Sequence, residues 1–311
     1  MFAVQFHRFG PPEVLGVGEF PEPHAGPGQV RIRVRASGVA PVDLALRAGT
    51  SAAGATLSLP HVPGVDAAGV VDEVGPGVTS AAIGDEVFGA VELARLGGAS
   101  AEFAVLAFWA PRPATMPWAE AGAAGTSIET ATRALDHLAL SPGRTVLIHG
   151  AAGGVGSVAV QLAVARGARV IGTARPENQA FLVRLGAIAT TYGPGLAERV
   201  RALSDGRVDA ALDVAGSGSL PELLSITGSA DTVVTLADFT GPQHEVLLSV
   251  GELGGQPHGR HGLADAAALH REGRFRIPLQ QVFALDQAAQ AHTLAAHGPR
   301  QGKIALSVPP E

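Results

Sequence analysis

The chain of 311 residues contains no cysteine. Without thiols it forms no disulfide, and it offers no thiolate ligand for a zinc ion. Its 11 histidines do not supply other ligands in a recognisable pattern, since no H-E-x-x-H motif or comparable spacing occurs among them. The sequence therefore predicts a protein without bound metal.

Long apolar runs and blocks of like charge are also absent. No apolar run reaches the length needed to span a membrane, and the first residues do not show the basic and apolar regions of a signal peptide. The net charge of −6 is spread along the chain, so nucleic acid is not expected as a partner. We expect a cytoplasmic protein that binds neither membrane nor nucleic acid.

The first part of the chain, residues 1–122, has the pattern of a β-rich domain within a chain long enough for two domains. Its run QVRIRVRAS at 29–37 alternates apolar and charged residues, as a strand does when one side faces solvent. Turns rich in glycine and proline separate this run from similar ones. Short strands joined in this way predict a small barrel-like sheet.

From about residue 123 onward, strand-like and helix-like segments alternate, which is typical of an α/β fold with a doubly wound parallel sheet. The predicted strands are 145–149, 169–173, 207–214, 232–236 and 245–250, and the predicted helices are 126–138, 155–166, 176–185, 196–203 and 220–226. The remainder is expected to form a loop at 251–262, helices at 263–271 and 287–296, and a strand at 303–308.

The turn after the first of these strands reads AAGGVG, with Ala151, Gly153 and Gly156 at the spacing of a dinucleotide-binding fingerprint. The first position makes a tight turn, the second lets a pyrophosphate approach the backbone, and the third lets helix and strand pack closely. Gly154 and Val155 open the helix, whose free N–H groups favour phosphate. A glycine-rich loop without a nucleotide is the alternative.

The second strand of this unit ends at Thr173, Ala174 and Arg175. An NAD-preferring site carries an acid there, which binds the 2′-hydroxyl of the ribose. Here no acid repels a 2′-phosphate, and Arg175 is available to pair with one. The sequence therefore predicts NADPH as the cofactor, although an exposed arginine at a helix start is the alternative interpretation.

Five segments in order carry a resemblance to a known family: GVAPVD at 38–43, PGVDAAGVV at 63–71, GDEV at 84–87, AAGGVGSVAVQLA at 151–163 and GKI at 302–304. On these segments the chain resembles the medium-chain dehydrogenase/reductase superfamily, within its zinc-free quinone oxidoreductase-like branch. The segments extend over nearly the whole chain.

The resemblance implies a domain organisation and an assembly. A GroES-like catalytic domain would span 1–122, a Rossmann NADP-binding domain 123–258, and a segment at 259–311 would return to the first domain. The active site would lie in the cleft between the two domains. A homodimer would form through the outer strands near 232–250, where an open sheet edge otherwise needs covering.

The chain departs from the family pattern around the acceptor. Zinc-dependent relatives place Cys near position 40 and a His–Glu pair near 65 and 66, where this chain has Ala40, Val65 and Asp66. Many quinone reductases of the branch have Asn at position 40 and Tyr soon after Arg47, and neither is present. These departures agree with the absence of zinc and leave the acceptor unnamed.

Cofactor contacts are also implied by the resemblance. Thr130, in ETATRAL, matches the position where relatives contact the nicotinamide, unless its hydroxyl only bonds its own helix backbone. Tyr192, the only tyrosine, matches a residue beside the cofactor ribose and 2′-phosphate. Two loops after strands are expected to line the nicotinamide half of the cofactor through their backbone: Ala215, Gly216, Leu236, Ala237, Asp238 and Phe239.

Several charged residues are candidates for the catalytic domain. Asp43 and Arg47, four residues apart, are expected to pair and to shape the substrate mouth, with a purely structural ion pair as the alternative. Asp66 is expected to fix its own turn through backbone N–H groups. Lys303 would be structural or would contact the cofactor. His61 would be a surface loop histidine without an evident partner, with a proton donor at neutral pH as the alternative.

With no metal and no evident acid beside the nicotinamide, we expect the proton to come from water, which favours conjugated acceptors over alcohols. The predicted function is NADPH-dependent hydride transfer to a quinone or an α,β-unsaturated carbonyl. Two alternatives remain open. One is a specialised biosynthetic enone or polyketide reductase, in which Ala40 leaves room for a bulkier substrate. The other is an inactive NADPH-binding sensor or scaffold protein.

Overall fold

The computed structural model describes residues 1–51, 54, 57–92 and 96–309, and the chain divides into two compact units. The first unit comprises Met1–Thr126, Leu263–Arg271 and Arg276–Glu311, and the second comprises Ser127–Gly262 and Glu272–Phe275. Each unit has its own six-stranded sheet and its own apolar core. The predicted α/β fold class, with one β-rich unit and one parallel-sheet unit, is confirmed.

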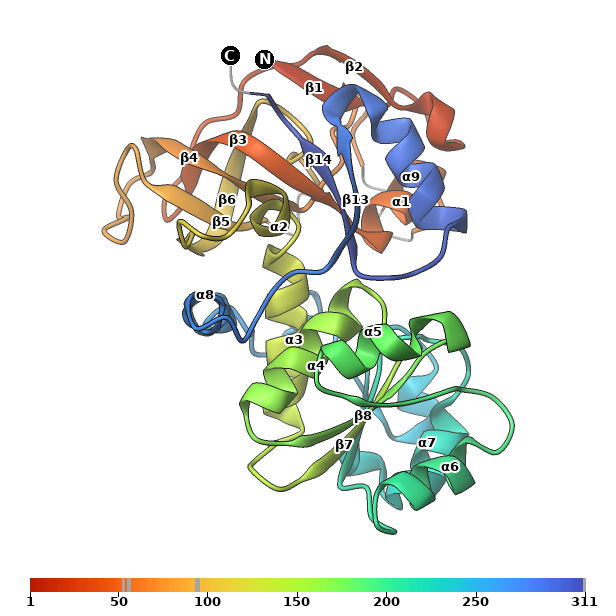
Figure 1. Cartoon of the computed structure of the whole chain (residues 1–311). Helices are drawn as coiled ribbons and strands as arrows, with labels where there is room; N and C mark the ends of the chain where they lie inside the picture. The colour runs from red at the N-terminus through yellow and green to blue at the C-terminus, as the bar shows by residue number, and fades with distance from the viewer. Residues whose placement is uncertain (52–53, 55–56, 93–95, 310–311) are drawn as a thin grey trace. The chain divides into compact units, whose positions relative to one another are not determined.

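The sheet of the first unit contains β3 (Val30–Val39), β4 (Asp66–Val74), β5 (Glu86–Val91), β6 (Phe103–Pro111), β13 (Leu279–Ala284) and β14 (Lys303–Ser307). Its order is β13–β14–β3–β4–β5–β6, and β3 also pairs with β6. That additional pairing closes β3, β4, β5 and β6 into a small barrel. In Figure 1 the C-terminal strand β14 lies beside β3, so the end of the chain completes this sheet.

Two further strands, β1 (Phe2–Gln5) and β2 (Gly16–Glu19), form a separate antiparallel pair. The helices of this unit are η1 (Pro12–Val14), α1 (Pro41–Ala48), α2 (Trp118–Gly122), η8 (Leu285–Gln287) and α9 (Ala288–His297), and α8 (Gly262–Arg271) lies almost wholly within it. Strands β2, β5, β6 and β13 were not predicted. Strand β6 is an almost continuous apolar run, FAVLAFWAP, which lacks the alternation on which the prediction relied.

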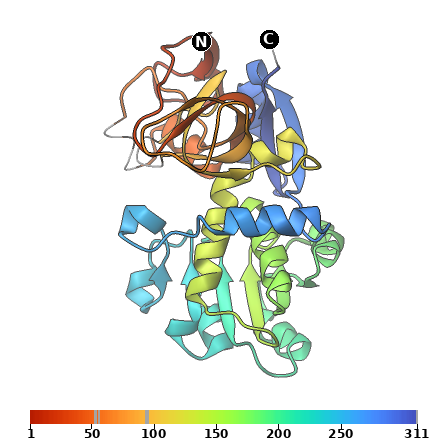
Figure 2. The ribbon, with the colours of Figure 1, turned by 90° about the vertical axis from the view of Figure 1, so that its left-hand side faces the viewer.

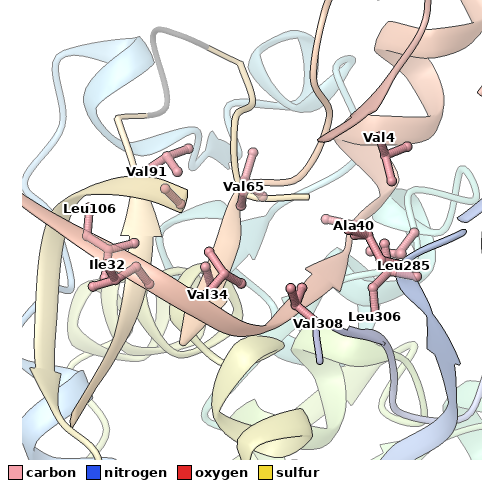
Figure 3. Close-up of a cluster of buried hydrophobic side chains, with 14 of the residues drawn as sticks. Val4, Ile32, Val34, Ala40, Val65, Val91, Leu106, Leu285, Leu306 and Val308 are labelled. Atoms are coloured by element: carbon pink, nitrogen blue, oxygen red, sulfur yellow. The ribbon is translucent and has the colours of Figure 1, made fainter. Parts of the chain in front are cut away.

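The core of the first unit lies inside the barrel and beneath the C-terminal strands. Along β3 the burial alternates, so that Ile32 and Val34 are almost completely buried while the neighbouring arginines are only partly buried. Figure 3 shows these two side chains gathered with Leu106 of β6 and Leu306 of β14. Segments far apart in the sequence therefore share one apolar cluster.

The second unit holds a parallel sheet of β7 (Thr145–His149), β8 (Arg169–Thr173), β9 (Ile188–Thr190), β10 (Ala210–Asp213), β11 (Val233–Thr235) and β12 (Leu247–Leu248). Their order is β12–β11–β10–β7–β8–β9, and every pairing is parallel. The chain starts in the middle at β7, winds outward through β8 and β9, and then returns to β10 on the other side. The sheet is therefore doubly wound, and its direction of winding switches between β7 and β10.

The helices of the second unit are α3 (Gly125–His137), α4 (Gly154–Ala165), η4 (Pro176–Asn178), α5 (Gln179–Arg184), α6 (Leu196–Leu203), α7 (Leu220–Thr227), η5 (Ala230–Thr232), η6 (Gly241–His244) and η7 (Gly251–Gly254). Figures 1 and 2 show helices α3 to α7 around the strands. The helix predicted at 176–185 is split, because its proline-led first turn is a 3₁₀ helix. The strands predicted at 207–214 and 245–250 are shorter, as β10 and β12.

Candidate cofactor and active site

The tight turn at the end of β7 is made by Gly150, one residue before the predicted position Ala151. Gly150 has a φ of +85°, a left-handed conformation that glycine adopts without strain. Its N–H donates to the Thr173 hydroxyl at 3.1 Å, and the Ala151 N–H donates to the Thr173 carbonyl at 3.0 Å. The glycine was visible in the sequence as the first residue after the strand. The ends of β7 and β8 are thus joined directly behind the turn.

The other two glycines of the fingerprint occupy different surroundings. A Cβ on Gly156 would lie 2.3 Å from the Gly150 carbonyl oxygen, so α4 can pack this closely against the turn only without a side chain there. At Gly153, by contrast, a Cβ would meet nothing nearer than 3.7 Å, and the space over the backbone is open. Gly153 precedes α4, and no side chain caps the helix. The first N–H groups of α4, from Gly154 and Val155 onward, remain available to an anion.

After β8 the chain passes through Ala174 to Arg175, whose side chain is 54% exposed. Its nearest carboxylate, Glu177, lies 4.0 Å away, which is too far for a hydrogen bond. Gln179 fixes the loop by donating to the Ala174 carbonyl at 2.8 Å and to the Thr190 carbonyl at 2.9 Å. The guanidinium is thus exposed on a backbone held firmly at the carboxyl end of β8.

Tyr192 lies near the same edge of the sheet, at the side of His149, the last residue of β7. The two rings form an edge contact with centroids 6.2 Å apart, and Tyr192 is 48% exposed. His149 Nδ1 is 3.0 Å from the Thr173 hydroxyl, and Nε2 is 3.0 Å from the Ser219 hydroxyl. Burial lowers the pKa of His149, although Asp213 and Glu222 oppose this. The sequence interpretation did not use this histidine.

Two loops that were expected to line the cofactor are built by one buried carboxylate. Asp213 Oδ1 accepts the N–H groups of Ala215 and Gly216 at 3.0 and 3.1 Å, and Oδ2 accepts the Thr235 hydroxyl at 2.8 Å. The Thr235 hydroxyl in turn accepts the N–H groups of two residues in the second loop. The residues of that loop are Leu236, Ala237, Asp238 and Phe239, of which Phe239 is 76% exposed.

The predicted nicotinamide contact, Thr130, is half-buried on α3. Its hydroxyl does not bond the helix backbone, which was the alternative, but meets two side chains of the same helix. It donates to Glu129 Oε2 at 3.2 Å and accepts from Arg133 Nη2 at 3.4 Å. Sequence reasoning missed Glu129 and Arg133, although opposite charges four residues apart on a predicted helix are a recognisable signal.

Asp43 and Arg47 lie on α1 as expected, but the predicted ion pair between them is wrong. The Asp43 carboxylate accepts the N–H groups of Ala40 at 2.8 Å and Gly64 at 3.0 Å, and it is 1% exposed. Arg47 instead donates to the carbonyl of Gly10. Burial raises the pKa of Asp43 to about 7 against the opposing effect of the two N–H groups. Backbone donors are thus what bind this carboxylate.

Asp66, Lys303 and His61 also differ from expectation. Asp66 accepts the backbone N–H of Thr126, at the start of α3, rather than N–H groups of its own turn. Lys303 Nζ lies 3.1 Å from Asp66 Oδ2, which gives this lysine a structural partner. His61 is not a free surface histidine, because its Nε2 lies 3.1 Å from the Leu96 carbonyl and burial lowers its pKa.

Within residues 1–51, 54, 57–92 and 96–309, no three side chains of the metal-binding types come together as a candidate site. Over the same ranges, no helix combines the length and the apolar character needed to cross a membrane.

Two family models match the chain, one in each half. The model described as "Alcohol dehydrogenase GroES-like domain" matches residues 26–110, and the model described as "Zinc-binding dehydrogenase" matches residues 185–306. The first match covers most of the barrel, and the second begins in the parallel-sheet unit and ends in β14.

Several curated relatives are quinone oxidoreductases. The protein of Pseudomonas aeruginosa is 31% identical over 325 residues, which cover 97% of this chain and 98% of that protein. The rat protein is 37% identical over 187 residues, but these cover only 59% of this chain and 55% of the rat protein. The chain thus matches about half the length of the rat relative. The full-length match shows that the chain belongs to the medium-chain dehydrogenase/reductase superfamily, in its quinone oxidoreductase-like branch.

Solved structures agree with this assignment. The quinone oxidoreductase of Coxiella burnetii has a TM-score of 0.87 and 29% sequence identity, with 99% of both chains covered. The quinone oxidoreductase of Escherichia coli, solved in complex with NADPH, has a TM-score of 0.81 and 25% identity, with 99% of this chain and 100% of that chain covered.

Proposed function

We propose that the chain is an NADPH-dependent, zinc-independent reductase that passes hydride to a quinone or an α,β-unsaturated carbonyl. One feature carries the proposal: at the carboxyl ends of β7 and β8, an uncapped helix N-terminus stands beside an exposed arginine. Free N–H groups suit the pyrophosphate of a dinucleotide. Arg175, in the place of the acid of an NAD site, suits the additional 2′-phosphate.

The residues present fit NADPH. The open space over Gly153 lets a pyrophosphate approach the backbone, and Arg175 has no strong partner to give up, since Glu177 is 4.0 Å away. Tyr192, half-exposed beside the same strand ends, can pack against the adenosine ribose. The E. coli relative that contains NADPH supports this choice. Thr173 and Ala174 would contribute the loop that holds Arg175 in place.

Bound NADPH would supply the hydride, and the chain would hold its nicotinamide. Thr130 would contact the nicotinamide, and the loops of Ala215–Gly216 and 236–239 would line it through backbone groups held by Asp213. The proton would come from water. A quinone or enone accepts hydride under these conditions because its reduced anion is delocalised, whereas a simple carbonyl needs a metal or a strong acid. Ala40, Val65 and the cysteine-free composition support zinc independence.

Asp43 and Arg47 enter the proposal as residues that shape the acceptor wall without touching the acceptor. Both are buried, at 1% and 5% exposure, and both hold backbone groups. Asp43 fixes the first turn of α1 next to Ala40, through the N–H group of that residue. Ala40 itself is 6% exposed and packs in the core of the first unit.

Three coarser features complete the proposal. We place the domain limits at 1–122, 123–258 and 259–311, and the protein in the cytoplasm. A homodimer would form through β12, which ends the order of the parallel sheet and so leaves one edge open within the described chain. Light scattering tests the assembly, and a monomer at micromolar concentration would refute it.

The decisive experiment follows NADPH oxidation with a naphthoquinone, a simple enone and, as control, an unactivated aldehyde, each with and without EDTA. We expect turnover with one or both conjugated acceptors, none with the aldehyde, and no effect of EDTA. Turnover confined to bulky enones would favour a biosynthetic reductase. Tight NADPH binding without oxidation by any acceptor would refute the enzymatic proposal and favour a sensor or scaffold.

A further inference from the structure

Thr130 stands beside a buried ion pair to which the proposed function gives no role. Its members, Glu129 and Arg133, have side chains only 6% and 8% exposed. Arg133 Nε lies 3.0 Å from Glu129 Oε1, and Arg133 Nη2 lies 3.2 Å from Oε2, so the guanidinium and the carboxylate meet through both of their ends. Such a two-point contact fixes the planes of both groups.

The ion pair is also tied to a distant segment of the same unit. Arg133 Nη1 donates to the Ser249 hydroxyl, directly after β12. Glu129 Oε1 accepts the N–H of Gly259 at 3.0 Å. Each side chain is therefore held from both sides, and neither is free to turn. The pair acts as a rigid support on the face of α3 that carries Thr130.

The charges of the pair decide which way the Thr130 proton points. Burial by itself raises the pKa of Glu129, but the hydrogen bonds and charge of Arg133, with the Gly259 N–H, lower it below its ordinary value. An ionised carboxylate can only accept hydrogen bonds, and a guanidinium can only donate them. Of the two contacts of the Thr130 hydroxyl, it must therefore donate to Glu129 and accept from Arg133.

A hydroxyl has one proton and two lone pairs. The proton of Thr130 is engaged with Glu129, and one lone pair faces Arg133. What remains for a ligand is a single lone pair. In its present contacts the Thr130 hydroxyl can accept a hydrogen bond from a ligand but cannot donate one.

We infer that Glu129 and Arg133 are positioning residues that fix the Thr130 hydroxyl as an acceptor for the amino group of the nicotinamide carboxamide. This inference rests on the proposed function, because it requires a nicotinamide beside Thr130. It predicts that the protein binds cofactors that can donate a hydrogen bond to the Thr130 hydroxyl in preference to cofactors that cannot. A polar group in a binding site selects strongly against a ligand that lacks its hydrogen-bond partner.

The binding of two reduced cofactor analogues tests directly whether the Thr130 hydroxyl accepts a hydrogen bond from the carboxamide amino group. In the 3-acetylpyridine analogue of NADPH a methyl group replaces the amino group, whereas the thionicotinamide analogue keeps the amino group and changes the carbonyl oxygen. We expect wild type to bind the acetylpyridine analogue about tenfold more weakly than NADPH, the usual effect of one hydrogen bond, and the thionicotinamide analogue with little loss. Titration calorimetry gives each Kd without turnover.

Variants of the Glu129–Arg133 ion pair then show whether the pair orients the Thr130 hydroxyl or only stabilises the fold. In Glu129→Gln the amide can turn its NH₂ group toward Thr130 and free the threonine proton, so the tenfold preference should disappear. Thr130→Val should abolish it as well, and Thr130→Ser should keep it. If Glu129→Gln does not fold, Glu129→Leu combined with Arg133→Leu removes both charges, a replacement that buried ion pairs often tolerate, and should also abolish the preference.

The outcomes distinguish this inference from the function on which it rests. If wild type binds the acetylpyridine analogue as tightly as NADPH, or if all variants keep the tenfold preference for NADPH, Thr130 is not fixed as an acceptor by Glu129 and Arg133. Either result leaves NADPH binding and turnover unaffected. Wild type that fails to bind NADPH would overturn the proposed function and this inference together.

Discussion

Lys303 Nζ lies 3.1 Å from Asp66 Oδ2, although 237 residues separate the two in the sequence. Their side chains are 5% and 0% exposed. Lys303 begins β14 and Asp66 begins β4, so the pair joins the C-terminal segment to the barrel. Asp66 also accepts the N–H of Thr126 at 2.6 Å and its hydroxyl at 2.8 Å. One carboxylate thus holds both the end of the chain and the start of α3.

Lys303→Met should be strongly destabilising, because it leaves the Asp66 charge buried without its partner. Breaking a buried ion pair from one side costs about 3–5 kcal/mol of unfolding free energy. Denaturant-induced unfolding measures the change. The matched control is Lys303→Met combined with Asp66→Asn, in which the amide still satisfies Thr126 and no charge is left, so most of the lost stability should return. A single variant as stable as wild type would contradict the role of the pair.

Asp43 should make a distinctive contribution to the dependence of stability on pH. Burial raises its pKa from about 3.8 to about 7 in the folded protein, so the folded state binds this proton more tightly than the unfolded chain. The resulting stabilisation is complete below pH 4 and is lost as the pH rises to about 7.

The test compares the unfolding free energy of wild type with that of Asp43→Asn at several pH values between 4 and 8. The variant cannot titrate, so the advantage of wild type should shrink as the pH rises toward 7 and then level off. Because the other carboxylates titrate in both proteins, their effects cancel in the difference. A difference that grows with pH would show that the backbone N–H groups of Ala40 and Gly64 outweigh burial.

Arg175→Ala should weaken NADPH binding far more than NADH binding. A charge-assisted hydrogen bond contributes about 1.5–3 kcal/mol, which corresponds to roughly 10- to 100-fold in Kd. The exposed Arg184 on α5 provides the matched control, since Arg184→Ala removes the same charge from the same unit. Fluorescence titration gives both constants. Equal losses for the two cofactors, or equal losses in the two variants, would argue against a contact between Arg175 and the 2′-phosphate.

The sequence was sufficient for features that depend on local pattern. The alternation in β3 and the strand–turn–helix order around Gly153 each follow from the spacing of residues that are close in the chain, and both were predicted within a residue or two. Strand β6 was missed because its sequence is apolar along almost its whole length, so the alternation of apolar and polar residues that marks a strand is absent from it.

What the sequence could not show are the contacts between residues far apart in the chain. Asp66 was expected to bond its own turn, but its partners are Thr126 and Lys303. Asp43 and Arg47 have the spacing of an ion pair, yet nearby backbone N–H groups bind Asp43 instead. A spacing of four permits contact without selecting it over a better-placed donor, and only the fold determines which donor is close.

The two glycines of the turn should respond differently to the same change. Gly156→Ala places a Cβ 2.3 Å from the Gly150 carbonyl oxygen and 2.8 Å from the Ala151 Cα, so α4 must move away from the turn and the unfolding free energy should fall. The expected loss is about 1–3 kcal/mol, as for other overpacked sites. Gly153→Ala meets no atom within 3.7 Å and should fold like wild type, since its φ of −75° suits alanine.

The same alanine at Gly153 should nevertheless weaken NADPH binding by at least tenfold, because its methyl group enters the space through which the pyrophosphate approaches the backbone. Thermal unfolding and NADPH titration of both variants separate the two effects. A Gly153→Ala protein that is stable and binds NADPH as tightly as wild type would show that the pyrophosphate does not lie over this residue.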